Sequence, residues 1–256
     1  MSPARQRLTT EQEAFLKVRS LATTCSSGYV IEPHTHPWRQ LLYATTGAMT
    51  VNAGRSTWMI PPGKAVLIPA GCKHSIRMWG SVAMRSLYFH ADLEAPALEA
   101  ADCRVLSVTP LLRELVLRVI DLAALDARVP AHQRLLDLLL DEMDLPAITP
   151  WMLPLPADTR AIAVAEQVLA RPSDADSLDD FARRFAVGRR TLERLFRDET
   201  GLSFGLWRQK VRLLDSIRLL AEGKSVTDAA LDTGYSSVSA FIAAFKNTFG
   251  CTPSRL

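Results

Sequence analysis

Four side chains in the first third of the chain carry nitrogen or oxygen donors at a spacing that suits a metal ion. His34, His36 and Gln40 form a short H-x-H-x3-Q run, and His74 follows after a stretch rich in glycine and proline turns. Three imidazoles and one amide oxygen are reasonable ligands for a divalent first-row metal ion, with positions left open for water or an effector. A metal site, a metal-free effector pocket and purely structural histidines all stay open as interpretations.

A second set of side chains is cationic and lies near the C-terminus. The outward face of a predicted helix carries Arg189, Arg190, Glu193, Arg194 and Arg197. Residues 183–212 hold nine Arg and Lys against three Asp and Glu, a net charge of +6, whereas the whole chain carries only +3. Arginine matches guanine edges in the major groove, and neighbouring cations hold phosphates. This pattern favours DNA binding over a merely solvated helix face.

Two short helices joined by a tight turn must position that cationic face. Apolar residues recur at helical spacing over 178–185, directly after Ser177, which is a good N-cap. Gly188 interrupts the pattern, and the helical spacing resumes over 192–196. The sequence therefore predicts a helix-turn-helix unit over 177–200.

The same arrangement repeats beyond one long helix. Residues 203–222 predict a helix of 20 residues, about 30 Å long at about 1.5 Å per residue. A short helix over 225–231, a turn over 232–234 and a second candidate recognition helix over 237–249 follow. One turn of duplex DNA is about 34 Å long, so two recognition helices at this separation suit successive major grooves.

The order of short motifs in this region resembles the DNA-binding domain of the AraC/XylS family. The motifs are R-T-L-x-R-L-F at 190–196, E-T-G-L-S-F at 199–204, G-Y at 234–235 and F-G-C-T-P-S at 249–254. The resemblance implies a bacterial transcription regulator with two helix-turn-helix units. Arg190, Glu193 and Arg194 would then face bases.

In the second recognition helix the positions implied by this resemblance are less polar. They are Val238, Ser239, Ala240 and Ala243, with Ser237 and Lys246 better suited to phosphates. The family often has Arg where this chain has Ala243, and an alanine methyl can touch only the methyl group of thymine. We therefore expect most base discrimination to come from the first unit.

Residues 20–92 have a different texture, in which short apolar runs alternate with Gly and Pro turns. Strands are expected at 41–44, 48–51, 56–60, 65–68 and 83–89. Many short strands with regular turns indicate an antiparallel sandwich or barrel.

Two motifs within this part resemble those of cupins. The spacing G-x5-H-x-H-x3-Q-x6-G begins at Gly28, and G-x5-P-x-G-x2-H begins at Gly63. The resemblance implies a small barrel with the three histidines and Gln40 at its mouth, although cupins usually have Glu at the place of Gln40 and Asn at that of Met78. The pocket is expected to add Trp38, Tyr43, Trp58, Arg85 and Tyr88.

Two helices and a connector are expected between these parts. Residues 110–126 and 130–144 each open with Pro and run at helical spacing. The second is more apolar than one buried face needs, so it either pairs with a second copy of the chain or covers the barrel. Residues 146–157 are rich in Pro and predict a stiff, extended connector.

The predicted fold class is therefore α+β with two domains. A cupin-like antiparallel β-barrel over 1–108 is followed by a helical segment over 109–145, a linker over 146–157 and an all-α DNA-binding domain over 158–256. No apolar run is long enough to span a membrane, and the first 17 residues contain no apolar signal core. A cytoplasmic protein with reduced cysteines is expected.

Two functional hypotheses follow from these features. One is a sequence-specific transcription regulator whose barrel senses a small molecule or a metal. The other is a metal-dependent cupin enzyme, an oxygenase or isomerase, with a helical appendage. An enzyme has no need of the cationic helix face, so the regulator is favoured and no catalytic residue is predicted. The expected partners are double-stranded operator DNA and an effector, with RNA polymerase and a second copy of the chain as further candidates.

Overall fold

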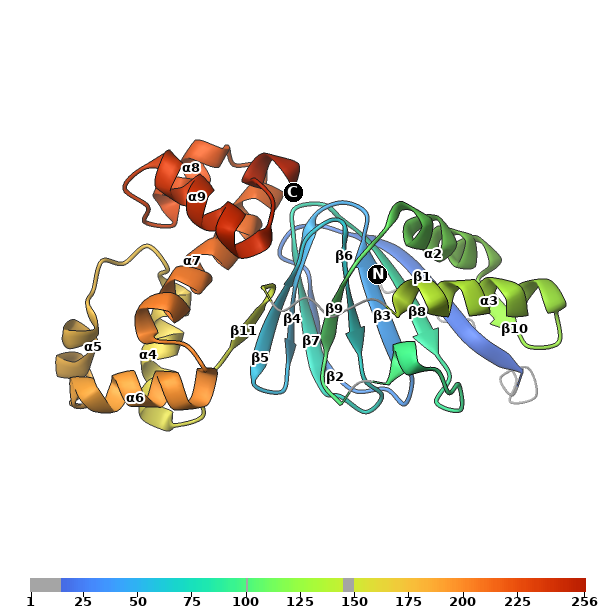
Figure 1. The fold of residues 1–256 in the computed structure, drawn as a ribbon, viewed down its shortest axis with the longest axis horizontal. Helices are drawn as coiled ribbons and strands as arrows, with labels where there is room; N and C mark the ends of the chain where they lie inside the picture. The colour runs from blue at the N-terminus through green and yellow to red at the C-terminus, as the bar shows by residue number, and fades with distance from the viewer. Residues whose placement is uncertain (1–14, 100, 145–149) are drawn as a thin grey trace. The chain divides into compact units, whose positions relative to one another are not determined.

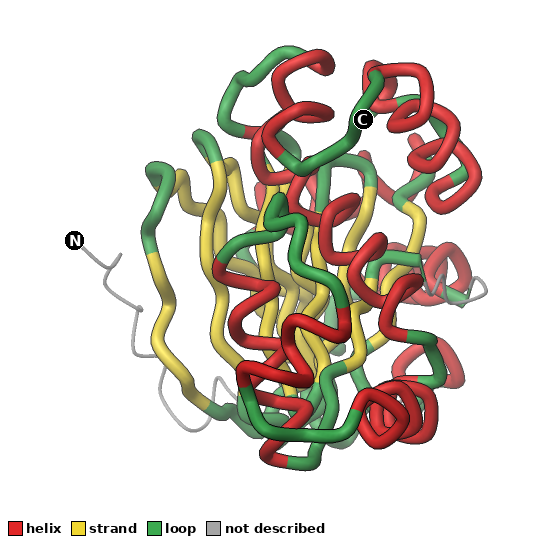
Figure 2. The backbone as a smooth tube through the Cα atoms, turned by 90° about the vertical axis from the view of Figure 1, so that its left-hand side faces the viewer, coloured by secondary structure: helices red, strands yellow, loops and turns green. Residues whose placement is uncertain are grey.

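The computed structural model describes residues 15–99, 101–144 and 150–256, and these form two compact units. One unit is built from described residues of 1–49 and 60–149, and the other from 50–59 and 150–256. Strands are the main elements of the first half of the chain, and the chain after residue 158 contains helices and their connecting turns (Figures 1 and 2).

The strands form two sheets that contain antiparallel strand pairs. The first sheet has the order β10-β1-β8-β3-β6-β9 and the second the order β11-β5-β4-β7-β2. The strands are β1 (Leu16–Cys25), β2 (Val30–His34), β3 (Arg39–Ala44), β4 (Ala48–Ala53), β5 (Ser56–Ile60), β6 (Lys64–Ile68), β7 (His74–Trp79), β8 (Val82–Phe89), β9 (Arg104–Ser107), β10 (Ala124–Asp126) and β11 (Met152–Pro154).

Two helices cover one face of the six-stranded sheet (Figure 1). They are α2 (Pro110–Leu122) and α3 (Pro130–Met143), and a short 3-10 helix, η1 (Pro96–Leu98), precedes them. Alternation along β3 sends Leu41 and Tyr43 into the core beneath these helices, so Gln40 and Leu42 belong to the opposite face. The helix-covered face is thus a continuous apolar core, and the other face is free to carry polar groups.

The α3 helix buries one apolar face in this core. Leu136, Leu139 and Met143 belong to the core cluster, as expected of a helix that covers the sheet. Leu138 is 42% exposed and Leu111 of α2 is 46% exposed. Pairing of these helices with a second copy of the chain stays a prediction.

The predicted helix over 110–126 is too long. It ends at Leu122, because Ala123 adopts a left-handed φ of 62° that an α-helix cannot continue. Residues 124–126 instead form β10, an edge strand that pairs with β1, and the Ser20 hydroxyl donates to the Ala123 carbonyl at 2.9 Å. The backbone N–H and C=O groups of residues 124–126 therefore bond to β1 instead of continuing the helix that the spacing predicts.

Several strands lie outside the five that apolar patterning predicted. β1 and β2 carry polar residues on both faces or half-buried positions in succession, so they lack a clean alternation, whereas β7 alternates buried residues with half-buried or exposed ones. β1 is nevertheless the central partner of both β8 and β10. Its pairing is fixed by neighbouring strands rather than by its own pattern.

The connector between the two predicted domains contains a strand. Residues 145–149 lie outside the described residues, whereas β11 pairs with β5 in antiparallel register, with Met152 opposite Trp58. The Trp151 ring stacks on Phe249 at 4.4 Å, and Trp207 Nε1 donates to the Pro154 carbonyl at 2.8 Å. Residues 151–154 of the connector therefore contact β5, α7 and α9.

The C-terminal part is all-α, as predicted. Its helices are α4 (Thr159–Ala170), α5 (Leu178–Arg184), α6 (Arg189–Thr200), α7 (Phe204–Ala221), α8 (Val226–Asp232) and α9 (Val238–Phe249), and a short 3-10 helix, η2 (Pro253–Arg255), follows. Together with the antiparallel sheets, these helices confirm the α+β fold class. Among the described residues, no helix combines the length and the apolar character needed to cross a membrane.

Candidate nucleic-acid interface and histidine cluster

The α5–α6 pair is the first helix-turn-helix unit. The Ser177 hydroxyl accepts from the backbone N–H of Asp180, and the Asp180 carboxylate accepts from the backbone N–H of Ser177. This capping box fixes where α5 begins. Ala186 then takes a left-handed φ of 51°, and α6 starts directly after Gly188. Phe196 is fully buried, so the apolar face of α6 faces the helical core and its charged face is turned outward.

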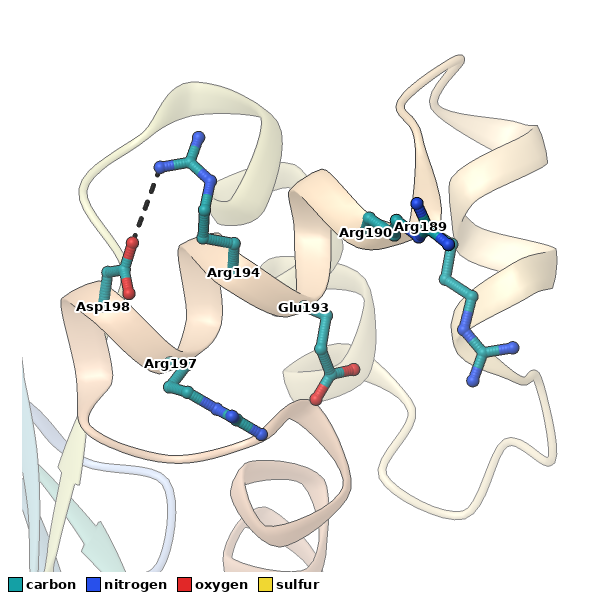
Figure 3. A pocket seen from close by; sticks show the side chains of 6 residues that line it. All are labelled: Arg189, Arg190, Glu193, Arg194, Arg197 and Asp198. Atoms are coloured by element: carbon teal, nitrogen blue, oxygen red, sulfur yellow. Dashed lines mark hydrogen bonds and ion pairs between the residues drawn. The ribbon is translucent and has the colours of Figure 1, made fainter.

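The outward face of α6 is hollowed and strongly charged (Figure 3). The hollow has a volume of about 450 Å³ and is lined by Arg189, Arg190, Glu193, Arg194, Arg197 and Asp198. Five of these six residues are the ones that the sequence predicts for DNA contact. The structure brings them together on one face of α6.

Partners within the protein divide these residues into two groups. Arg189 donates to Asp179 of α5 at 2.8 Å, and Arg194 lies 3.5 Å from Asp198. In the described part of the chain, Arg190, Glu193 and Arg197 make no side-chain hydrogen bond or ion pair. Asp179 was not predicted as a site residue, because nothing in the sequence indicates a pair across ten residues and a turn.

Replacing Asp179 with Asn should strengthen binding to DNA of any sequence. The Asp179–Arg189 pair is exposed, with side-chain exposures of 53% and 63%, so it adds at most about 1 kcal/mol to stability. Its removal frees Arg189 and deletes a negative charge that repels phosphates. We expect affinity for an unrelated duplex to rise by up to about tenfold and the salt dependence to steepen by about one counterion.

Fluorescence anisotropy over a range of salt concentrations measures both quantities. Asp137→Asn on α3 is the matched control, since it makes the same charge change outside the helix-turn-helix units. An unchanged salt slope for Asp179→Asn would show that Arg189 makes no phosphate contact.

The α8–α9 pair is the second helix-turn-helix unit, and its outward face is nearly uncharged. Ser237 caps α9, accepting from the backbone N–H of Ala240 at 3.2 Å, so its hydroxyl already has a partner. The other predicted positions follow on α9. Ser239, Ala240, Ala243 and Lys246 are exposed, and Val238 is half-buried. Asn247 is also exposed and was not predicted, although it lies one turn beyond Ala243.

Two cations of the basic segment have structural partners. Arg212 donates to the carbonyls of Pro172 and Asp174 at 2.8 and 2.9 Å, and Arg208 donates to the carbonyl of Asp176. These bonds tie α7 to the loop before α5. The net charge of the segment therefore overstates the charge that is free for DNA.

The three histidines of the N-terminal part converge. Ring centroids are 4.3 Å apart for His34 and His74, 5.1 Å for His36 and His74, and 5.8 Å for His34 and His36. One ring nitrogen from each lies within 4.8 Å of those of the other two. The ends of β2 and β7 bring two of the histidines together, because His34 pairs with His74 in the register of these strands.

Backbone carbonyls set the tautomer of each ring. Nδ1 lies 2.9 Å from the Glu32 carbonyl in His34, 2.6 Å from that of Trp38 in His36 and 2.9 Å from that of Cys72 in His74. A carbonyl only accepts, so each Nδ1 carries the proton and each neutral ring keeps a lone pair on Nε2. Metal-binding histidines typically donate one ring N–H to a carbonyl in this way, which leaves the other ring nitrogen for the ion.

His74 is the most enclosed of the three. Burial lowers its pKa to about 4, with smaller contributions from His34 and His36 that a hydrogen bond to Cys72 opposes. The ring is therefore neutral at physiological pH. Its Nε2 is buried and has no hydrogen-bond partner in the described structure. Such an orphaned lone pair suits a metal ion, so the residues present fit one.

Gln40 joins the cluster through its amide. Gln40 Oε1 lies 3.1 Å from His36 Nε2, and its Nε2 donates to the Ser86 hydroxyl at 3.0 Å and to that of Tyr88 at 3.2 Å. In a neutral ring His36 Nε2 and Gln40 Oε1 are both acceptors, so their approach is favourable when they share a cation. Rotating the amide by half a turn would let Gln40 donate to His36 instead, which is the arrangement expected without metal.

The remaining predicted pocket residues do not all lie beside the histidines. The Tyr88 ring is 5.4 Å from His36, and the Trp38 ring packs against His90 at 4.9 Å with the Arg19 guanidinium 4.8 Å above it. Trp58 is buried on β5. Tyr43 and Arg85 pair with each other across β3 and β8, and Tyr43 belongs to the core under α2. These two therefore lie on the opposite sheet face from Gln40.

An antiparallel sheet domain with a polar cluster, followed by two helix-turn-helix units with a cationic recognition helix, is the arrangement of a two-domain DNA-binding regulator. Comparison with known proteins agrees with this assignment. Residues 19–147 match the model of the AraC-like ligand binding domain, and residues 181–256 match that of a helix-turn-helix domain. The chain therefore belongs to the AraC family of transcriptional regulators.

Individual relatives cover the chain to different extents. The HTH-type transcriptional regulator NimR of Escherichia coli is 33% identical over 223 residues, which are 87% of this chain and 80% of NimR. RipA of Corynebacterium glutamicum is 40% identical over 101 residues, 40% of this chain and 30% of RipA. ToxT of Vibrio cholerae aligns structurally with a TM-score of 0.39 and 13% identity over 93% of this chain and 94% of ToxT. Family membership confirms that the chain is a DNA-binding transcription regulator rather than an enzyme. Sensing of a small molecule or a metal by the barrel stays a prediction.

Proposed function

We propose that the protein is a cytoplasmic regulator whose binding to operator DNA responds to a divalent first-row metal ion held by His34, His36 and His74. The observation that carries this proposal is the convergence of three imidazoles whose Nδ1 atoms all lie within hydrogen-bond distance of backbone carbonyls. A bound ion would supply a Lewis-acidic centre with open positions for an effector. Because Gln40 is neutral, the ion's charge would not be compensated by these four residues.

The connector offers a physical route for coupling to the helices. β5 pairs with β11, and the residues around β11 contact Phe249 of α9 and Trp207 of α7. A shift of β5 would therefore be transmitted to both α7 and α9. RNA polymerase and a second copy of the chain, the latter through α3, complete the proposed set of partners.

Metal content measured by mass spectrometry tests the site. The protein is purified without an affinity tag or chelator, beside His34→Ala/His36→Ala and the control His90→Ala/His132→Ala, which removes two histidines outside the cluster. The wild type and the control should hold close to one ion per chain, and the first variant should hold none. Equal content in all three proteins, or no metal in the wild type after reconstitution, would contradict the proposal.

Replacing Gln40 with Glu should tighten metal binding. The substitution adds the anionic ligand that the cluster lacks and removes the amide that can donate to His36 in the metal-free arrangement. We expect the dissociation constant for Zn²⁺ or Co²⁺ to fall by about tenfold or more. Calorimetric titration measures it, with Gln133→Glu on α3 as the control for added charge. Unchanged or weaker binding by Gln40→Glu would exclude this position from the coordination sphere.

A further inference from the structure

The two recognition helices differ so strongly in chemistry that they cannot select the same bases. The α6 helix presents Arg190, Glu193 and Arg194 from its N-terminal half, and Arg190 and Glu193 have no side-chain partner within the described chain. The corresponding part of α9 presents Ser239, Ala240 and Ala243. One face is built from forked donors and a carboxylate, and the other from methyl groups and one hydroxyl.

The α6 residues favour G·C pairs. Arginine bonds guanine O6 and N7 in the major groove, and a carboxylate accepts from the amino group of cytosine. Arg190 and Arg194 are one helical turn apart, about 6 Å along the axis, and base pairs stack about 3.4 Å apart. These three side chains therefore reach bases within about three successive pairs. Glu193 also repels every base edge that offers only acceptors, which sharpens the choice of cytosine.

The α9 residues favour thymine. Exposed alanine methyls at 240 and 243 can contact the C5-methyl group of thymine but form no hydrogen bond to any base. Lys246 lies in the last turn of α9, where a cation suits a phosphate better than a base edge. Ser239 can donate to or accept from several bases and adds little selectivity.

The helix that joins the two units sets their spacing. α7 contains 18 residues, about 27 Å at about 1.5 Å per residue, and the two recognition helices begin beyond its ends. One turn of duplex DNA is about 34 Å. The two units thus suit major-groove segments about one turn apart.

We propose that the operator of this regulator is chemically asymmetric. Under α6 it carries two guanines and a cytosine within about three successive base pairs, distributed over either strand. About one helical turn away, under α9, it carries a thymine-bearing segment with weaker selection. The inference concerns which DNA is bound and does not depend on the metal proposed above.

Selection from a library of randomised duplexes by the full-length protein, followed by sequencing, tests this inference. The selection is run once with chelator and once with Zn²⁺. If metal does not control binding, enrichment is equal under both conditions, and the base preferences can still be determined. The expected product is a G·C-rich segment and a thymine-bearing segment one turn apart.

Four variants assign the contacts. Glu193→Gln should exchange one selected cytosine for adenine, because glutamine pairs with adenine N6 and N7. Arg190→Ala should abolish selection of one guanine and weaken the selected site by about tenfold or more. Ala243→Arg should create a new guanine in the second segment. Arg197→Ala, on the same helix but nearer its C-terminus, should weaken all sequences alike and leave the preferences unchanged.

Circular dichroism confirms that each variant is folded before it is used. Selected sites without guanine under α6, or an unchanged cytosine for Glu193→Gln, would overturn the inference. So would a second segment that stays unchanged for Ala243→Arg.

Discussion

Phe196→Ala should lower the free energy of unfolding of the DNA-binding part by about 3 to 5 kcal/mol, the cost of a large cavity in a close-packed core. The Phe196 ring is fully buried and lies 5.1 Å from the rings of both Phe204 and Trp207. These contacts hold α6 against α7. Because a domain of this size has a stability of only about 5 to 15 kcal/mol, the variant should also lose most of its DNA binding.

Leu206→Ala is the matched control, because this leucine is 56% exposed on α7. It should change stability by no more than about 0.5 kcal/mol. Denaturant unfolding followed by tryptophan fluorescence compares the two, since Trp207 reports on the site directly. Equal midpoints for the two variants would mean that Phe196 does not organise the first helix-turn-helix unit.

Gly47→Ala should destabilise the sheet domain by about 2 to 5 kcal/mol, the sum of a left-handed backbone cost and overpacking. Gly47 has a φ of +71°, and an added Cβ would lie 2.7 Å from both the Ser81 carbonyl oxygen and a methyl carbon of Val82. Neither neighbour is the end of a flexible chain, so the turn between β3 and β4 must move.

Gly63→Ala separates the two contributions. Gly63 has nearly the same φ of +75° but nothing within 4 Å of an added Cβ, so it should lose only the backbone part, about 1 to 2 kcal/mol. Thermal unfolding followed in the far ultraviolet measures both variants. If the two glycines cost the same, the close approach to Ser81 has no energetic weight.

Local patterns predicted the elements whose own residues specify them. The Ser177 N-cap and the helical apolar spacing of α6 are both present, and α6 ends at Gly201, which has a left-handed φ of 73°. The histidine spacing likewise predicted a cluster that the structure brings together. For the helical features the information lies within a few residues, whereas the histidine cluster also depends on the pairing of β2 with β7, which places His34 opposite His74.

Features that depend on distant pairing were not predictable in this way. β10 was assigned to a helix because its pairing with β1 is formed across more than a hundred residues. Nothing near Arg189 shows that Asp179 will hold it, and nothing in the proline-rich connector indicates that Pro154 will accept from Trp207. The cupin-like motif does not specify on which face of β3 Tyr43 lies, because that face depends on how β3 pairs with β6 and β8.

Operator affinity in the presence and absence of metal tests the central claim most directly. A duplex selected by the wild type is titrated by fluorescence anisotropy with chelated and with Zn²⁺-loaded protein, for the wild type and for His34→Ala/His36→Ala. Zn²⁺ is expected to change the affinity of the wild type for this duplex by about tenfold or more and to leave the affinity of the variant unchanged. Identical affinities for loaded and chelated wild-type protein would contradict metal control by the histidine cluster.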